Sequence, residues 1–223
     1  MYQDYLIDEL DHYQLASSLE DLGLIKNQDV NMVVHERMIG SDLQSYLNIM
    51  VENGFTAFNQ TLSLGEFSVV FDNHFKKESI FQESEHELLK QDVFKLLSSF
   101  DKVMESSSMT VLFTIVDSNM CTRFHTDMYD FRMISSYIGQ GTCWLGTDNV
   151  HFDALKSGGT NEEIVLRESD IQQLKQSDVA IMRGELSLSN VGGVVHRSPA
   201  IEHLNQKRIV LRVDSKSLLN SFN

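Results

Sequence analysis

The chain has 223 residues, 42% of them hydrophobic and 22% charged, so it is long enough to bury a sizeable core and has the composition of a globular protein. A formal net charge of −14 argues against a nucleic acid or an anionic membrane as partner, and no apolar run reaches the length of a membrane span. Two cysteines are too few for a disulfide scaffold and the acidic N-terminus lacks the features of a signal peptide, so we expect a cytoplasmic protein.

The first half of the chain, residues 1–105, has the pattern of a mainly helical region. Ser41 starts an amphipathic stretch that ends at Asn53, just before Gly54, which predicts a helix with a polar cap at its start. A second helix is predicted from Glu78 to about Met104, because apolar residues recur there at spacings of three and four. Between the two helices, the run EFSVVFDN (66–73) is short and apolar enough for a strand. We expect this region to pack on the second half.

The second half, residues 106–223, is typical of a β-sheet core. Short β-branched runs separated by glycine-rich turns occupy 109–118, 131–139, 178–185, 192–198 and 207–215. No helix-length segment separates most of these runs, which favours an antiparallel sandwich or barrel over alternating β-α units. The sequence therefore predicts an α+β fold in which the two halves form one compact unit.

A histidine and an aspartate lie two residues apart in the run RFHTD, at His125 and Asp127. Residues at this spacing on a strand point to the same face, and burying both side chains is costly unless a cation joins them. The later run GGVVHRSPA supplies His196. Two histidines and one carboxylate with the remaining positions open are the ligand set of non-heme Fe(II) sites.

Other metal-ligand choices compete with this one. A second His-x-Asp run at 151–153 leads into a polar, glycine-rich stretch and is less favoured. His203 follows Pro199 in a predicted loop, where a solvated histidine is the default. Cys121 lies close enough in sequence to complete a closed zinc site, although we expect both Cys121 and Cys143 to be small buried residues.

The last predicted strand, KRIVLRVD, alternates between apolar and basic residues. If the apolar set faces the helices, Arg208 and Arg212 point inward, and an inward arginine calls for a bound anion such as a carboxylate. The alternative is that both arginines lie on a solvated strand face.

The order of FHTD, DVAIMRGE, VVHRSP and KRIVLRVD resembles that of the motifs in the Fe(II)/2-oxoglutarate-dependent dioxygenases. The pattern is still more similar to a bacterial family of unknown function with an FHxD, YxGxGTxWL and HR(S/T)P signature. The resemblance covers roughly residues 109–214. It implies a double-stranded β-helix core, also called a jelly-roll or cupin-like core.

The resemblance also implies roles for individual residues. The Fe(II) ligands are then His125, Asp127 and His196. Arg208, with Arg212 in reserve, binds the far carboxylate of the cosubstrate 2-oxoglutarate, and Tyr137 lines the cosubstrate pocket. Many family members have serine or tyrosine two residues beyond the arginine, where this chain has Val210.

The expected reaction is the O2-dependent hydroxylation, or a related oxidation, of a small molecule or a peptide side chain. Arg132 and Trp144 are predicted to line the substrate mouth, although Trp144 also suits a place in the core. Two other functions stay open: a cupin-like metalloenzyme that does not use 2-oxoglutarate, and a non-catalytic metal-binding protein in metal homeostasis. The sequence leaves the oligomeric state open.

Overall fold

Two β-sheets and five α-helices make up the computed structural model of the chain, which describes residues 12–104 and 107–215. The large sheet has the strand order β1-β2-β8-β5-β10-β4-β3, and the small sheet has the order β7-β6-β9. Within the described residues, β1 and β2 form the one parallel pair, and all other neighbours are antiparallel. The protein is therefore a mixed α and β structure built on a large antiparallel sheet.

The strands of the large sheet are β1 (Tyr13–Leu15), β2 (Met32–His35), β3 (Phe58–Leu62), β4 (Met109–Val116), β5 (Phe131–Ile138), β8 (Val179–Arg183) and β10 (Arg208–Ser215). Those of the small sheet are β6 (Cys143–Leu145), β7 (Gln172–Gln173) and β9 (Val195–Arg197). The helices are α1 (Ser41–Asn53), α2 (Leu64–Phe75), α3 (Glu83–Met104), α4 (Phe152–Ser157) and α5 (Asn161–Ile164). Short 3₁₀ helices lie at Glu20–Lys26, Thr147–Asn149, Glu168–Asp170 and Glu202–Leu204.

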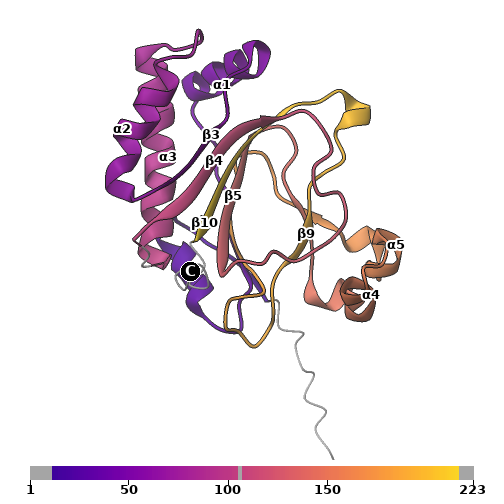
Figure 1. Cartoon of the computed structure of the whole chain (residues 1–223). Coiled ribbons are helices and arrows are strands. Elements are labelled where there is room, and N and C mark those ends of the chain that lie inside the picture. Colours follow the sequence, from indigo (N-terminus) through magenta and orange to yellow (C-terminus); the bar gives the residue numbers. More distant parts are fainter. Residues whose placement is uncertain (1–11, 105–106, 216–223) are drawn as a thin grey trace, which may run out of the picture.

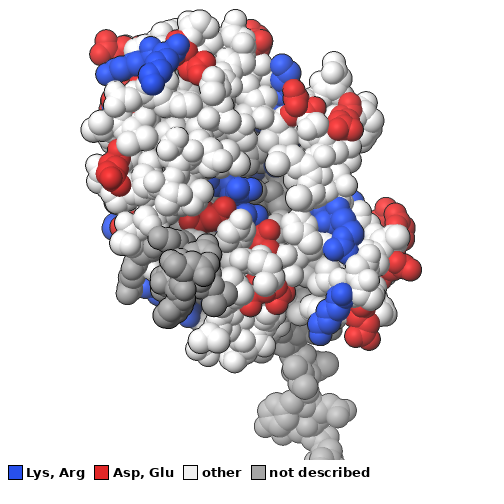
Figure 2. Space-filling model, viewed as in Figure 1, with Lys and Arg blue, Asp and Glu red and all other residues white. Residues whose placement is uncertain are grey.

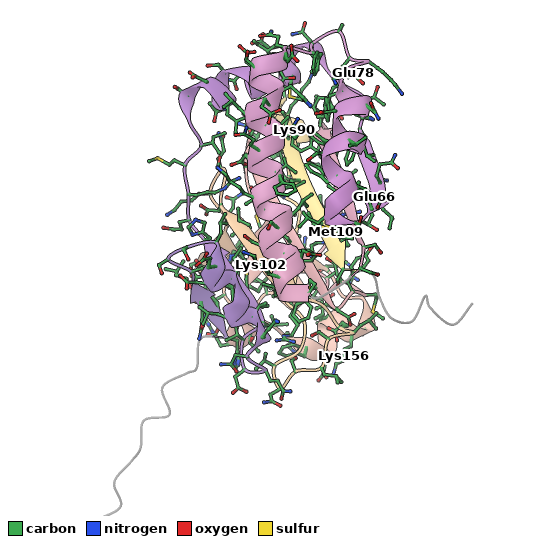
Figure 3. All side chains as sticks on the ribbon, turned by 90° about the vertical axis from the view of Figure 1, so that its left-hand side faces the viewer. Glu66, Glu78, Lys90, Lys102, Met109 and Lys156 are labelled. Carbon is green, nitrogen blue, oxygen red and sulfur yellow. The ribbon has the colours of Figure 1, made fainter. Side chains whose placement is uncertain are left out.

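Helices α1, α2 and α3 lie together on one side of the large sheet, and α4 and α5 lie near β9 (Figure 1). Figure 3 shows α3 running along the sheet, with Lys90 and Lys102 on it, and α2 beside it. Every second residue of β10 faces these helices, and these residues, Ile209, Leu211 and Val213, are fully buried. The other face of the large sheet is therefore left to face the small sheet.

The apolar residues between the two sheets form a second core. Ile134, Ala180, Met182 and Val210 come from the large sheet, and Trp144 comes from the small one. A third cluster lies on the outer face of the small sheet, beneath α4 and α5. The space between the sheets is thus walled by apolar side chains, and a polar side chain placed there needs a specific partner.

The run at 66–73, predicted to be a strand, is helical. Ser63 and Glu66 form a capping box at the start of α2, which satisfies backbone donors there. Phe67, Phe71 and Phe75 follow at a spacing of four, so one helical face buries all three rings against the sheet. The helical period and the cap outweigh the local strand preference, and the strand prediction was wrong.

Two helix starts also differ from prediction. Ser41 is the first helical residue of α1, and Gly40 occupies the cap position without a side-chain cap. Helix α3 begins at Glu83 rather than Glu78. The helix ends at Asn53 and Met104 were predicted correctly, and Gly54 follows the first of them with a positive φ of 77°.

The first half of the chain also supplies β1, β2 and β3, so the large sheet contains strands from both halves. The five β-branched runs of the second half do contain β4, β5, β8, β9 and β10, as predicted. Within 12–104 and 107–215, none of the helices combines the length and apolarity required to cross a bilayer.

Candidate metal centre

Three side chains from two distant segments of the sequence converge in the space between the sheets. His125, Asp127 and His196 each offer a ligand atom, and these atoms lie within 4.8 Å of one another. The Nε2 atom of His196 is 3.2 Å from Asp127 Oδ2, and that of His125 is 3.6 Å from Asp127 Oδ1. The two imidazole centroids are 4.7 Å apart. The structure thus brings the three residues predicted as metal ligands close together.

The two histidines are brought together by direct backbone pairing rather than by a regular strand. His125 N donates to His196 O at 3.0 Å, and His196 N donates to His125 O at 2.9 Å, as an isolated antiparallel bridge beside β9. Directly opposed residues of an antiparallel pair project to the same face. The bridge therefore places both imidazoles side by side, although strand alternation was the basis of the prediction.

The backbone of Asp127 is fixed by the segment that follows β8. Glu185 N donates to Asp127 O at 2.9 Å, and Gly184 N donates to Asp130 O at 3.0 Å. A Cβ atom on Gly184 would lie 2.1 Å from Tyr129 O and 2.8 Å from Asp127 O, which is impossible without displacing that backbone. Glycine is therefore required for this close approach.

The ring nitrogens of both histidines have defined roles. The Nδ1 atoms lie 2.8 Å from Arg123 O for His125 and 3.0 Å from Val194 O for His196. A carbonyl oxygen can only accept, so each Nδ1 carries a hydrogen, and each Nε2 is the ring nitrogen that faces Asp127. This is the tautomer that metal-binding histidines adopt, with the second nitrogen held by a backbone carbonyl.

Asp127 is held in its charged form. Burial alone would raise the pKa of Asp127, but the imidazoles of His125 and His196 and the guanidinium of Arg132 together bring this pKa well below its ordinary value. Its carboxylate is thus ready to bind a cation at neutral pH. Two neutral imidazoles and one carboxylate fit a divalent transition metal, and three protein ligands leave further positions open.

Arg132, predicted to touch substrate, is instead buried behind the metal ligands. Its Nη1 donates to Asp127 Oδ2, and its Nε donates to Asp214 Oδ1 at 2.6 Å. Its guanidinium also lies over the ring of Tyr129, with a separation of 4.7 Å. The sequence pattern missed this role because the contact joins β5 to β10 and to the turn after His125. Arg132 orients the carboxylate rather than a substrate.

The competing ligands lie outside this cluster. His151 is exposed, and its side chain accepts from Ala154 N at the start of α4. His203 is exposed on a 3₁₀ helix. Cys121 is exposed, contrary to prediction, whereas Cys143 is buried as predicted. Within the described residues, the group of three is the one set of histidine, cysteine and acidic side chains that could hold a metal.

Arg208 is a buried cation that lacks an acidic partner among the described residues. It is 2% exposed, and Nη2 donates to Ser136 Oγ at 2.9 Å while Nε has no hydrogen-bond partner. Burial lowers the pKa of Arg208 to about 10. Arg212, on the same face of β10, is 30% exposed with Nε 3.1 Å from Asp214 Oδ2. Both arginines point inward, and Arg208 is the one that has no acidic partner among the described residues.

Tyr137, predicted to line a cosubstrate pocket, lies on the opposite face of the large sheet. It is fully buried in the helix-side core, where its hydroxyl donates to Asp92 of α3 and its ring lies 5.4 Å from the Arg37 guanidinium. Burial raises the pKa of Tyr137 well above its ordinary value. The strand parity used in the prediction does not hold, because His125 and Tyr137 belong to different sheets. The predicted place of Tyr137 is therefore wrong.

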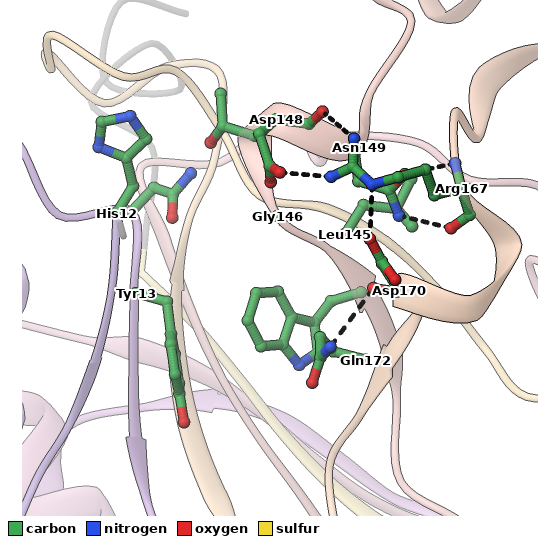
Figure 4. A pocket seen from close by; sticks show the side chains of 12 residues that line it. His12, Tyr13, Leu145, Gly146, Asp148, Asn149, Arg167, Asp170 and Gln172 are labelled. Atoms are coloured by element: carbon green, nitrogen blue, oxygen red, sulfur yellow. Dashed lines mark hydrogen bonds and ion pairs between the residues drawn. The ribbon is translucent and has the colours of Figure 1, made fainter. Parts of the chain in front are cut away.

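Trp144 lies opposite His196 in the pairing of β6 with β9, and its ring packs 4.9 Å from that of Tyr13. It also lines a cavity of about 600 Å³, whose lining includes none of the three grouped ligands. Figure 4 shows Arg167 on one side of this cavity, joined to Asp148 and Asp170, and Tyr13 on the other. Trp144 thus separates this cavity from the histidine pair.

The molecular surface is hollowed on the face that Figure 1 shows. Figure 2 shows the face seen in Figure 1 hollowed near its middle, with basic and acidic side chains gathered there. The side chains of His125 and Asp127 are 25% and 15% exposed, so the group of three is reachable from solvent.

Metal affinity is expected to rise with pH. Asp127 raises the pKa of His125, so a larger share of this imidazole is protonated near neutrality and must lose a proton before it binds metal. Below the raised pKa, affinity should fall by about tenfold per pH unit, and above it the curve should level off. Mn(II) titrations between about pH 5.5 and pH 8 measure this effect. Affinity that does not change across this range would contradict it.

An Arg132→Met variant is expected to bind metal about 10- to 100-fold more weakly, because Asp127 loses the group that orients it. The matched control is Arg212→Met, which also removes a guanidinium beside Asp214 but leaves the Arg132–Asp127 contact intact. Calorimetric titration with Mn(II) measures the metal affinity of both variants. Equal affinities in the two variants would show that Arg132 does not position Asp127.

Comparison with known proteins gives a family and a fold. The family model described as "Protein of unknown function (DUF1826)" matches residues 16–214. No curated protein matches the chain.

Among solved structures, the dioxygenase for auxin oxidation 1 from Arabidopsis thaliana, determined with 2-oxoglutarate, has a TM-score of 0.53 at 8% identity over 91% of each chain. A prolyl-4-hydroxylase from Pseudomonas putida has a TM-score of 0.46 at 9% identity, over 90% of this chain and 99% of the other. HygX from Streptomyces hygroscopicus with iron bound has a TM-score of 0.42 at 11% identity, over 87% and 85%. The first of these shares its fold with this chain.

Proposed function

The chain belongs to the DUF1826 family, and with that as the premise we propose that it is a non-heme Fe(II)- and 2-oxoglutarate-dependent oxygenase. The observation that carries the proposal is the grouping of His125, Asp127 and His196, with the Nε2 atoms of both histidines turned toward the carboxylate. The buried, unpaired Arg208 on the same side of the sheet is the second support.

The proposed core is a double-stranded β-helix. From β4 to β10 the chain passes back and forth between the two sheets, with β4, β10, β5 and β8 adjacent in one sheet and β9, β6 and β7 in the other. The bridge from His125 to His196 stands where an eighth strand would extend the small sheet. This arrangement supports a closed jelly-roll of two four-stranded layers.

His125, Asp127 and His196 would hold the iron from one side and leave its other positions for exchangeable ligands. When bound, the iron and 2-oxoglutarate supply the oxidising chemistry, in which O2 is consumed, 2-oxoglutarate becomes succinate and CO2, and a substrate C–H bond is hydroxylated. The backbone bridge and the Arg132 contact keep the three ligands in place without rearrangement.

Arg208 is proposed to bind the far carboxylate of 2-oxoglutarate. Its planar fork suits a carboxylate, and its burial in an apolar wall makes an anion the natural partner. The hydroxyl of Ser136, which already contacts Nη2, stands in for the serine or tyrosine that Val210 replaces. Arg212 is less suited to this task, because its side chain is 30% exposed rather than enclosed in the apolar wall.

Apolar residues limit the access of water to the centre. Ile134, Met182 and Val210 form the wall on the large sheet, and Trp144 forms the facing wall. Trp144 is further proposed to border the substrate path, since it also lines the adjacent cavity. The requirement for ferrous iron suits the cytoplasm as the proposed location.

The deciding experiment is an anaerobic titration of the metal-free protein with Fe(II), followed by 2-oxoglutarate. A new visible charge-transfer band should appear on the second addition and be absent from a His125→Ala variant. Admission of O2 should then yield succinate.

Iron binding without any response to 2-oxoglutarate would favour a cupin-like metalloenzyme. A centre that binds metal tightly but neither 2-oxoglutarate nor O2 would favour a metal-homeostasis protein.

A further inference from the structure

We infer that Arg212 forms a substrate subsite for an anionic group, a carboxylate or a phosphate ester, beside the metal centre. The inference rests on the proposed function for the role of the bound molecule as substrate. The binding preference itself follows from the geometry of β10 and its neighbours.

Arg212 lies on the site-facing side of the large sheet. Strand alternation puts Arg212 and Asp214 on one face of β10, while Leu211 and Val213 are fully buried on the helix side. Asp214 lies opposite Arg132 on β5, and Arg132 contacts the metal ligand Asp127. Arg212 is thus connected to the metal centre through two intervening side chains.

The guanidinium of Arg212 has donors to spare. It lies 3.1 Å from Asp214 Oδ2 through Nε, yet it donates no hydrogen bond to any described residue. Its side chain is 30% exposed, against 8% for Arg132 and 5% for Asp214. Within this connected group, Arg212 is the arginine that can reach an incoming molecule, and its fork is suited to carboxylate or phosphate oxygens.

Among the described residues, the sheet surface next to Arg212 is only partly covered. On β4, Thr110, Leu112 and Thr114 face away from the helices and are half-buried, and β3 extends this surface with the exposed Asn59 and Thr61. The hydroxyls of Thr61 and Thr110 contact each other at 2.9 Å. The three strands of the small sheet cannot cover all seven of the large one. A molecule lying on this surface would contact the hydroxyls of Thr61 and Thr110 and the side chain of Leu112.

The charges around the loaded centre favour an anion there. Bound Fe(II) would be balanced by Asp127 and one carboxylate of 2-oxoglutarate, and Arg208 would be balanced by the other carboxylate of the cosubstrate. Asp214 then offsets one of the two guanidiniums beside it, those of Arg132 and Arg212. One positive charge is left over at the mouth of the site, in a chain whose net charge is −14. A partly enclosed positive charge of this kind attracts anions locally.

Ligand-observed NMR with matched pairs of small molecules tests this inference. Each pair contains a carboxylate or a phosphate monoester and its neutral amide or alcohol counterpart, and the protein carries Mn(II) and saturating 2-oxoglutarate. The anionic members should bind preferentially to the wild-type protein. Arg212→Gln should weaken their binding by at least about tenfold, whereas Arg212→Lys should retain much of it.

Arg197→Gln is the matched control, because Arg197 lies over the Phe124 ring on the outer side of the small sheet, 4.6 Å from it. This variant should keep the wild-type preference. Neutral members binding as well as anionic ones, or an unchanged set of ligands in Arg212→Gln, would overturn the inference. Preference for carboxylates over phosphates, or the reverse, identifies which anion the subsite takes.

A parallel titration of the Mn(II)-loaded wild-type protein with 2-oxoglutarate separates this inference from the proposed function. If the protein does not use 2-oxoglutarate, the cosubstrate will not bind but the Arg212-dependent preference for anions will persist. If the preference disappears while 2-oxoglutarate still binds to the wild-type protein, the subsite is wrong and the oxygenase proposal stands.

Discussion

A His196→Ala variant is expected to bind Fe(II) at least about 100-fold more weakly than the wild type and to lose turnover. Removing a ligand should cost at least as much as removing a residue that orients one, which typically costs 10- to 100-fold. The Nε2 atom of His196 lies 3.2 Å from Asp127 Oδ2, and within the described residues the group holds no histidine besides His125 and His196 that could replace it. Calorimetric titration with Fe(II) under anaerobic conditions measures the loss.

The matched control is His203→Ala. His203 lies seven residues later and is exposed, so its removal should leave metal affinity and folding unchanged. The backbone bridge from residue 196 to His125 does not need the imidazole, so the alanine variant should also fold. Comparable affinities in the two variants would refute the assignment of His196 as a ligand.

An Arg208→Met variant is expected to lose 2-oxoglutarate binding and yet gain stability. Truncating one partner of a buried charge pair costs about 2–5 kcal/mol of binding, which corresponds to roughly 30-fold to several thousandfold. In the ligand-free protein, the same change removes a buried charge with no acidic partner among the described residues. Replacing buried charge by an apolar side chain of similar size often stabilises by about 1–4 kcal/mol.

Thermal unfolding of the metal-free protein and titration with 2-oxoglutarate measure these two effects. Each kcal/mol should raise the Tm by about 2–4 °C in a domain of this size. Arg212→Met is the control, because Arg212 is partly exposed and its charge is offset by Asp214. This control should leave the 2-oxoglutarate affinity close to that of the wild type. A destabilised Arg208→Met protein that still binds 2-oxoglutarate would contradict both expectations.

The strands and the grouping of His125, Asp127 and His196 could be predicted from the sequence, because the patterns that indicate them are local. The β-branched runs predicted β4, β5, β8 and β10, and the short His-x-Asp spacing together with a later histidine predicted the three residues that the structure groups. Alternation along β10 correctly placed Arg208 and Arg212 on the inner face, since the apolar residues between them are buried under the helices.

The positions of Arg132 and Tyr137 could not be predicted from the sequence, because each depends on a contact between distant segments. Arg132 is opposite Asp214 only once β5 and β10 pair, and only then does it reach Asp127. Tyr137 depends on which sheet holds His125, and the isolated bridge puts that histidine beside β9 rather than in line with β5. Helix α2 was missed for a different reason. The run 66–73 was interpreted as a strand, although the capping box before it and the aromatic residues at a spacing of four are typical of a helix.

The pairing of His125 with His196 rests on two backbone hydrogen bonds between a non-strand segment and a three-residue strand. So short a contact has little strength of its own, because few backbone groups share the cost of ordering both segments. An ion held by both imidazoles would fasten the two segments to each other. Iron supply would then govern not only turnover but also how long this edge of the molecule resists proteases in the cell.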